Sequence, residues 1–370
     1  MGGNTDAMRT IIRAIFALAS VPAFLGAADE TQTIEQVYKN VQVLKGIPAA
    51  EIRSTMTYIS VALGVTCTHC HTPNGPWPQG YEKDDIKAKQ TAREMIRMTR
   101  QVNEASFAGR TVVTCATCHA GHTHPAAFVP ADTPEAIKNK IAQPARPDTA
   151  PLPTAEELFA KYERAIGGES AISRLTTRHL ITTTNAGGQS VRIDQFATSR
   201  GLVLQTTTAG PQTVTNGFDG RHAYSISGGT ATVVSGVNEE NIKLNALFFR
   251  NLRLNDAYSS ARTLRKEQLG GKDVYVVSGA LKLDRYTDLL FFDADSGLLA
   301  RRTTLTRTAL GPLPQTDDFE NYREVEGIKV SMDQLRSVPG VVAGPWHIEE
   351  IRFNEPMDDT KFAMPVAHAK

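Results

Sequence analysis

The chain has 370 residues, of which 41% are hydrophobic and 21% charged, and its formal net charge is +1. This composition is typical of globular proteins, and the length predicts about two domains. The near-neutral balance gives no sign of a nucleic-acid partner, and beyond the N-terminus no apolar run approaches the roughly 20 residues that span a membrane.

The N-terminal residues carry an export pattern. Arg9 and Arg13 precede an apolar stretch at residues 14–25, and small residues follow at 26–28. This order is typical of a signal peptide that is cleaved after Ala28, and an amphipathic first helix is the alternative. We therefore expect residues 1–28 to be a signal peptide and the mature protein to be periplasmic.

Two helices are expected next. In residues 33–44 the apolar side chains recur every three or four positions, as they do on one helical face, and Thr33 with Gln36 would form a capping box. Residues 49–63 repeat the spacing with Met56 on the apolar face, and a glycine follows as the stop signal. The second helix therefore leads directly into the first chemical motif.

The four cysteines of the chain lie in two Cys-x-x-Cys-His elements. These elements consist of Cys67, Cys70 and His71, and of Cys115, Cys118 and His119. Such spacing is the attachment signal for c-type haem, in which two thiols bond one porphyrin and the histidine binds its iron. Disulfides or a shared zinc site are the alternatives, but neither explains why a histidine follows each pair at once. We expect two covalent haem c groups.

A third helix is expected at residues 85–102, ahead of the second motif. Met95, Met98 and Val102 mark its apolar face. Four basic residues form a stripe along it, Lys89, Arg93, Arg97 and Arg100. We interpret this stripe either as a partner of haem propionates or as a solvated charged face. A methionine-bearing helix followed by a haem motif thus occurs twice, which is an internal repeat.

The group opposite each proximal histidine decides what a haem can do. A second protein ligand restricts the iron to electron exchange, whereas an open side permits chemistry on peroxide or oxygen. Met56 is the candidate for the first haem, and Met95, with Met98 as the alternative, is the candidate for the second. A methionine on an apolar face is otherwise core filler. His122 and His124 are competing ligands.

The rest of the chain has a different character. Residues 125–153 contain seven prolines and indicate a linker, with one short helix candidate at 134–141. A capped helix is expected at 154–166, where Thr154 and Glu157 form a capping box. Short β-rich runs alternate with glycine turns from residue 175 onward, interrupted by one helix near 239–250. The expected strands include 190–196, 202–208, 273–278, 288–292 and 328–332.

These patterns predict a multidomain fold. A mainly α cytochrome domain at residues 29–124 precedes an α+β domain at 154–370. In the second domain we expect an antiparallel sheet curved around a helix, because one flat sheet of that length would expose an apolar face.

Residues 41–130 resemble the cytochrome c subunit of photosynthetic reaction centres. The matching stretches include L-G-V-T-C-T-H-C-H, T-A-R-E-M-I-R-M-T-R and V-T-C-A-T-C-H-A-G. The resemblance implies a periplasmic electron carrier whose sixth iron ligands are helix methionines, matched here by Met56 and Met95. The family's familiar members hold four haems, whereas this chain has motifs for two.

The β-rich part resembles the lipoprotein-sorting (LolA-like) type of curved sheet in F-F-D-A-D-S-G-L-L-A-R and Y-R-E-V-E-G-I-K-V. That resemblance implies a concave apolar surface for a lipid or a protein. We therefore expect a non-enzymatic diheme carrier that passes single electrons to a redox partner protein, such as a membrane-bound photosynthetic or respiratory complex. A diheme peroxidase-like enzyme with one open haem is the alternative, and a haem-based sensor is a third reading.

Overall fold

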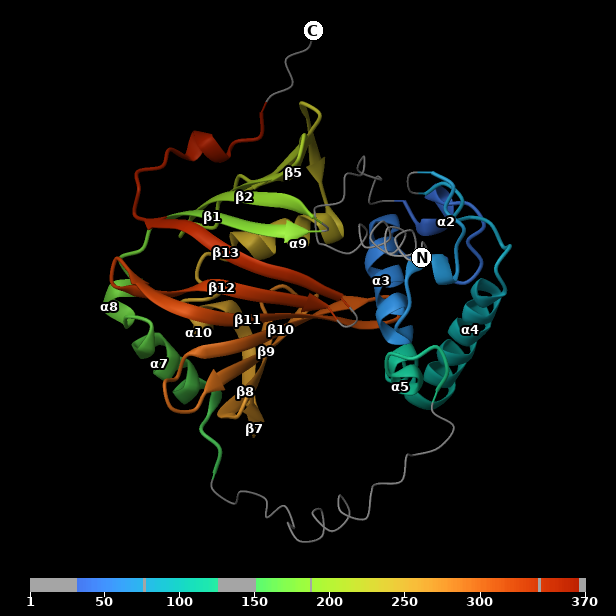
Figure 1. The fold of residues 1–370 in the computed structure, drawn as a ribbon, viewed down its shortest axis with the longest axis horizontal. Coiled ribbons are helices and arrows are strands. Elements are labelled where there is room, and N and C mark those ends of the chain that lie inside the picture. Colours follow the sequence, from blue (N-terminus) through green and yellow to red (C-terminus); the bar gives the residue numbers. More distant parts are fainter. Residues whose placement is uncertain (1–31, 76–77, 126–150, 187, 339–340, 366–370) are drawn as a thin grey trace, which may run out of the picture.

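The computed structural model describes residues 32–75, 78–125, 151–186, 188–338 and 341–365 (Figure 1). The expected signal peptide at 1–28 and the helix candidate at 134–141 lie outside these residues. Figure 1 shows a helical unit beside a large curved sheet. None of the described helices combines the length and the apolar character that a bilayer-spanning segment needs.

In the residues that the structure describes, the helical unit contains six short or medium elements. They are α2 (Ile34–Val37), η2 (Ala49–Glu51), α3 (Ile52–Leu63), η3 (Cys67–His69), α4 (Lys87–Phe107) and α5 (Cys115–His119). The second expected helix is confirmed as η2 and α3, and the third is confirmed as α4. Helix α4 begins two residues later than expected and continues for five more, until Ala108 adopts a left-handed conformation with φ 53°.

The helix expected at residues 33–44 is wrong beyond Val37. Tyr38 is extended, Asn40 has φ 58°, and the chain turns back so that the Ile34 amide donates to the Ile47 carbonyl at 2.8 Å. Ile34 and Leu44 are both buried in the core that results. The apolar side chains of this folded-back segment have the same spacing as those on one face of a helix. Periodicity alone therefore could not distinguish a helix from a folded-back segment.

The second part of the chain forms one 13-stranded antiparallel sheet. Its strand order is β6-β5-β4-β3-β2-β1-β13-β12-β11-β10-β9-β8-β7. The first six strands are β1 (Thr177–Ala186), β2 (Gln189–Thr198), β3 (Val203–Ala209), β4 (Gln212–Phe218), β5 (Ala223–Ser227) and β6 (Thr230–Val234). The others are β7 (Tyr258–Leu269), β8 (Lys272–Leu281), β9 (Tyr286–Asp293), β10 (Leu299–Thr308), β11 (Gly311–Val325), β12 (Ile328–Val338) and β13 (Val341–Phe353).

The curved antiparallel sheet expected here is confirmed, and each expected strand falls within one observed strand except for an end residue of 202–208. The accompanying helices are α7 (Ala155–Ala165), α8 (Glu169–Ile172), α9 (Gly236–Ala246), α10 (Leu254–Ala257) and η4 (Asp359–Phe362). Thr154 and Glu157 cap α7 as expected, through bonds of 2.8 and 3.2 Å. Phe159 of α7 and Ile242 of α9 lie in one apolar core with the sheet.

A buried polar cluster crosses this core. Asp288 of β9 has no exposed surface and accepts hydrogen bonds from Arg250 at 2.9 Å, Thr304 at 2.8 Å and Tyr258 at 2.7 Å. A buried carboxylate needs such partners, because an unpaired one would be very costly.

The two units share a core where the β10–β11 hairpin reaches the helices (Figure 1). Leu310 at the tip of this hairpin is buried in the same apolar cluster as Ile34 and Tyr58. A Cβ on Gly311 would lie 2.6 Å from the Tyr58 ring, so the strand and the ring are in close contact. Glu51 and Arg285 form a largely buried ion pair of 2.9 Å across the junction.

Candidate haem sites

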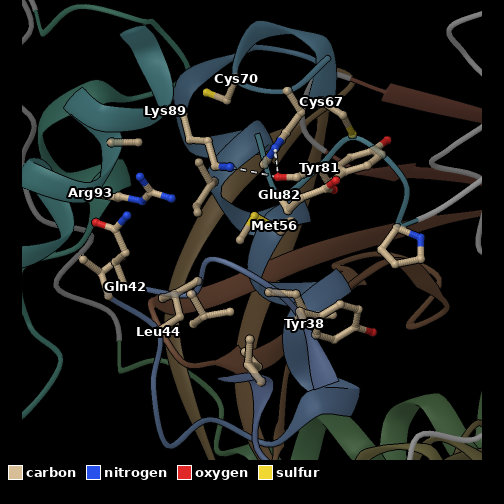
Figure 2. Close-up of a pocket in the computed structure, with 18 of the residues that line it drawn as sticks. Tyr38, Gln42, Leu44, Met56, Cys67, Cys70, Tyr81, Glu82, Lys89 and Arg93 are labelled. Atoms are coloured by element: carbon tan, nitrogen blue, oxygen red, sulfur yellow. Dashed lines mark hydrogen bonds between the residues drawn. The ribbon is translucent and has the colours of Figure 1, made fainter. Parts of the chain in front are cut away.

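A cavity of about 350 Å³ opens between α3, α4 and the segment of the first haem motif. Its wall contains every residue expected at the first haem, namely Met56, Cys67, Cys70 and His71. Apolar side chains complete the wall, among them Leu44, Ile52, Ile59 and Ile96. Figure 2 shows Met56 in the middle of the view, with Cys67 and Cys70 above it and Leu44 below. The cavity is within the usual size range of cofactor pockets, about 300–1,000 Å³.

The His71 ring is oriented as an iron ligand would be. Its Nδ1 lies 3.0 Å from the carbonyl oxygen of Tyr81 and donates to it, which leaves Nε2 free. Metal-binding histidines usually donate their second ring nitrogen to a carbonyl or a carboxylate. Burial lowers the pKa of His71, and the nearby charges of Lys89 and Arg93 lower that pKa further. The lowered pKa favours the neutral ring, which is the form in which histidine binds iron.

The second motif repeats this geometry on a more open surface. His119, at the end of α5, lies with Nδ1 2.9 Å from the His122 carbonyl oxygen, which again leaves Nε2 free. Met95 and Met98 on α4 are 36% and 42% exposed, so they form part of an exposed apolar surface on that helix. The side chain of His122 is exposed as well.

Asn103, near the end of α4, fixes the chain that enters the second motif. Its Oδ1 accepts from the amides of Val112 at 3.0 Å and Val113 at 2.8 Å, and its Nδ2 donates to the Val113 carbonyl at 2.7 Å. This buried side chain therefore ties the end of α4 to the segment that leads into α5. Sequence reasoning missed it, because a lone asparagine in a helix carries no recognisable signal.

The two attachment segments meet at the end of α3. Gly64 ends this helix with φ 65°, and the Gly121 amide donates to the Ala62 carbonyl at 2.9 Å. A Cβ on Gly64 would lie only 2.1 Å from the Gly121 carbonyl oxygen. Tyr58, two residues after Met56, approaches the Ala116 amide with its hydroxyl oxygen at 3.4 Å. One helix thus borders both candidate haem sites.

The basic stripe on α4 is only partly a solvated face. Lys89 and Arg93 line the cavity wall and are 12% and 10% exposed, respectively. Both contact Asp84, and the Arg93 hydrogen bond holds the pKa of that carboxyl well below its usual range. Arg100 donates to the Val43 carbonyl, whereas Arg97 is exposed. The solvated-face interpretation is therefore wrong for the two residues that line the cavity.

The alternatives to haem receive no support from this geometry. All four cysteines are unpaired. In the described part of the chain, no group of three or more His, Cys, Asp or Glu side chains converges in the way a metal ion requires. The residues present fit a haem at the first motif instead, because two thiols, a neutral imidazole and a thioether border one apolar cavity.

Residues 3–155 match the family of the photosynthetic reaction centre cytochrome c subunit. The resemblance expected from the haem motifs is thereby confirmed. The reaction centre cytochrome c subunit of Thermochromatium tepidum is 39% identical over 108 residues, which are 27% of this chain and 25% of that protein. Cytochrome c-554 of Chloroflexus aurantiacus is 40% identical over 86 residues, or 22% of this chain and 20% of its own. The chain spans between a fifth and a quarter of the length of these relatives.

Solved structures similar to this chain match a little over half of it. One is a LolA superfamily protein from Nitrosomonas europaea, with a TM-score of 0.41 and 13% identity over 57% of this chain and 98% of that one. Another is a DUF1329 family protein from Desulfovibrio piger, with a TM-score of 0.40 and 12% identity over 56% of this chain and 96% of that one.

Proposed function

We propose that this protein is a periplasmic diheme c-type cytochrome that transfers single electrons. The observation that carries the proposal is the first cavity, where Met56 and His71 border the same space as the two cysteine thiols. The match to a cytochrome c family supports it independently. In this proposal Cys67 and Cys70 would attach the first haem, and His71 and Met56 would bind its iron. Cys115 and Cys118 attach the second, with His119 and Met95 as ligands and Met98 as the alternative to Met95.

A bound haem supplies an iron that gains and loses one electron without breaking a substrate bond. The chain would contribute iron ligands held in fixed positions and a largely apolar cavity wall. The Tyr81 carbonyl holds the His71 ring in one orientation, and apolar side chains such as Ile52 and Ile59 of α3 and Ile96 of α4 line the cavity. Methionine opposite histidine raises the reduction potential of a haem. A site ligated on both sides passes electrons and has no open position for a substrate.

Partners and location follow from the same reasoning. Three of the relatives are reaction centre cytochrome c subunits, which favours a membrane-bound photosynthetic or respiratory complex as the redox partner. The N-terminal export pattern favours the periplasm, where the β-rich domain would bind a partner protein or a lipid. Lipid extraction from the exported protein, followed by mass spectrometry, tests the lipid part of this proposal.

The test of the electron-transfer role is the ligand set. Met56→Ala should remove the charge-transfer absorption of one methionine-ligated ferric haem, lower that haem's potential and open it to carbon monoxide. The wild-type protein should bind no carbon monoxide. If the wild type binds it readily at one haem, the peroxidase-like alternative with an open site replaces the carrier.

A further inference from the structure

We propose that Lys89 raises the reduction potential of the first haem above that of the second. Its ammonium group bonds to the Tyr81 carbonyl, which also accepts the hydrogen bond from the His71 ring. This inference rests on the proposed function, because it requires a haem at the first motif. It adds to that function a residue that sets the order of the two potentials. Lys89 is a positioning and charge-bearing residue and would not itself touch the iron.

The carbonyl oxygen of Tyr81 accepts two hydrogen bonds. One comes from His71 Nδ1 at 3.0 Å and the other from Lys89 Nζ at 2.9 Å. Figure 2 shows Lys89 extending toward Tyr81, with the hydrogen bonds dashed. The same ammonium group also donates to the Lys83 carbonyl at 2.6 Å and lies 3.1 Å from Asp84 Oδ1. Two hydrogen bonds to carbonyls and one ion pair therefore hold the charge in one place beside the proximal histidine.

The charges around this carbonyl do not cancel. Asp84 is shared between Lys89 and Arg93, whose Nη1 lies 2.8 Å from Asp84 Oδ2. Arg93 Nη2 also donates to the Asn40 carbonyl at 3.2 Å, which fixes the guanidinium. Lys89, Arg93 and Asp84 together carry a net charge of +1, and Lys39 and Glu82, which also line the cavity, carry opposite charges. Because both cations are largely buried in the wall of an apolar cavity, water screens them less than it screens surface charges.

This arrangement acts on the iron in two ways. A cation on the Tyr81 carbonyl withdraws electron density from the oxygen and weakens its bond to the His71 ring. The imidazole then has less anionic character and stabilises ferric iron less, since outer hydrogen bonds set the basicity of a ligand. The net positive charge also disfavours the oxidised haem directly. Both effects raise the reduction potential.

The second site lacks the same enclosure and serves as an internal comparison. His119 donates to the His122 carbonyl at 2.9 Å, so the first bond is equivalent. His122 lies in the segment at residues 121–125, in which every residue is exposed. Water at this loop weakens the effect of any nearby charge. The two haems should therefore titrate separately, with the first at the higher potential.

The experiment is a redox titration of the full-length holoprotein carrying Lys89→Met. One of the two midpoint potentials should fall by about 59 mV, which is a tenfold change in a one-electron equilibrium, while the other stays in place. Lys89→Arg should restore most of the potential. Arg97→Met is the matched control, because it removes an exposed cation from the same helix and should move neither potential.

A second variant shifts the potential the opposite way. Asp84→Asn removes the carboxylate that Lys89 and Arg93 share, so the first haem's potential should rise. The inference is overturned if Lys89→Met leaves both potentials in place, if both fall equally, or if Asp84→Asn lowers the first. These results differ from a failure of the proposed function, in which the wild type would lack haem or bind carbon monoxide.

Discussion

Gly64→Ala probes the contact that brings the two haem motifs together. Gly64 has φ 65°, and a side chain in the left-handed region costs about 1–2 kcal/mol. The added Cβ would lie 2.1 Å from the Gly121 carbonyl oxygen, so the loop after α5 must move. That movement would break the 2.9 Å bond from the Gly121 amide to the Ala62 carbonyl, which contributes about 1 kcal/mol. The expected loss of unfolding free energy is about 2–3 kcal/mol.

Gly46→Ala is the matched control for this variant. Gly46 has φ 78°, but a Cβ there would meet no atom within 4 Å. Gly46→Ala should therefore lose only the part of the unfolding free energy that comes from the left-handed conformation, about 1–2 kcal/mol. The difference between the two variants isolates the contact between Gly64 and Gly121.

The assay is urea unfolding of the haem-bearing proteins, followed by haem absorbance and by far-ultraviolet circular dichroism. Gly64→Ala should unfold at a clearly lower urea concentration than Gly46→Ala, with an unchanged slope. Equal midpoints for the two variants would show that Gly64 is not packed against Gly121. The placement of both haem motifs beside α3 would then be wrong.

Three further predictions concern the junction, the sheet and the second haem. Glu51→Gln leaves the buried Arg285 without its charged partner and should lower the free energy of unfolding by about 3–5 kcal/mol, measured by chemical unfolding. Adding Arg285→Met to that variant should recover part of the loss. Burial raises the pKa of Asp288, but two neighbouring arginines lower it by more, so it lies below 3.8. The stability that this carboxylate contributes is present above about pH 4 and is lost as the pH falls through the pKa of the folded state. The free energy of unfolding of Asp288→Asn should therefore fall less steeply on acidification than that of the wild type. Met95→Ala should remove the methionine absorption of the second haem while Met98→Ala keeps it, and the reverse would make Met98 the ligand.

The local features of this chain could be predicted from its sequence. The haem motifs, α4, the capped α7 and the strands are each specified by residues a few positions apart, through spacing, capping and turn chemistry. The helix at 33–44 failed because its apolar side chains lie on a folded-back loop whose closure depends on the distant contact from Ile34 to Ile47. Periodicity reports which side chains are buried and does not report how the chain buries them.

The features that connect distant segments were not predictable in this way. The approach of Gly64 to Gly121 joins residues far apart in the sequence, and either glycine alone indicates only a turn. The insertion of Leu310 into the helical core depends on where the sheet places its β10–β11 hairpin. The basic stripe on α4 did not show whether Lys89 faces a haem or solvent, because the loop that carries Tyr81 and Asp84 determines whether Lys89 is buried.

We propose that this chain carries two covalent haems that exchange single electrons through irons with a protein ligand on both sides. A redox titration of the exported protein, combined with haem quantitation, tests it most directly. We expect two haems per chain, two one-electron transitions at positive potentials and no binding of carbon monoxide. One haem or none per chain would contradict it.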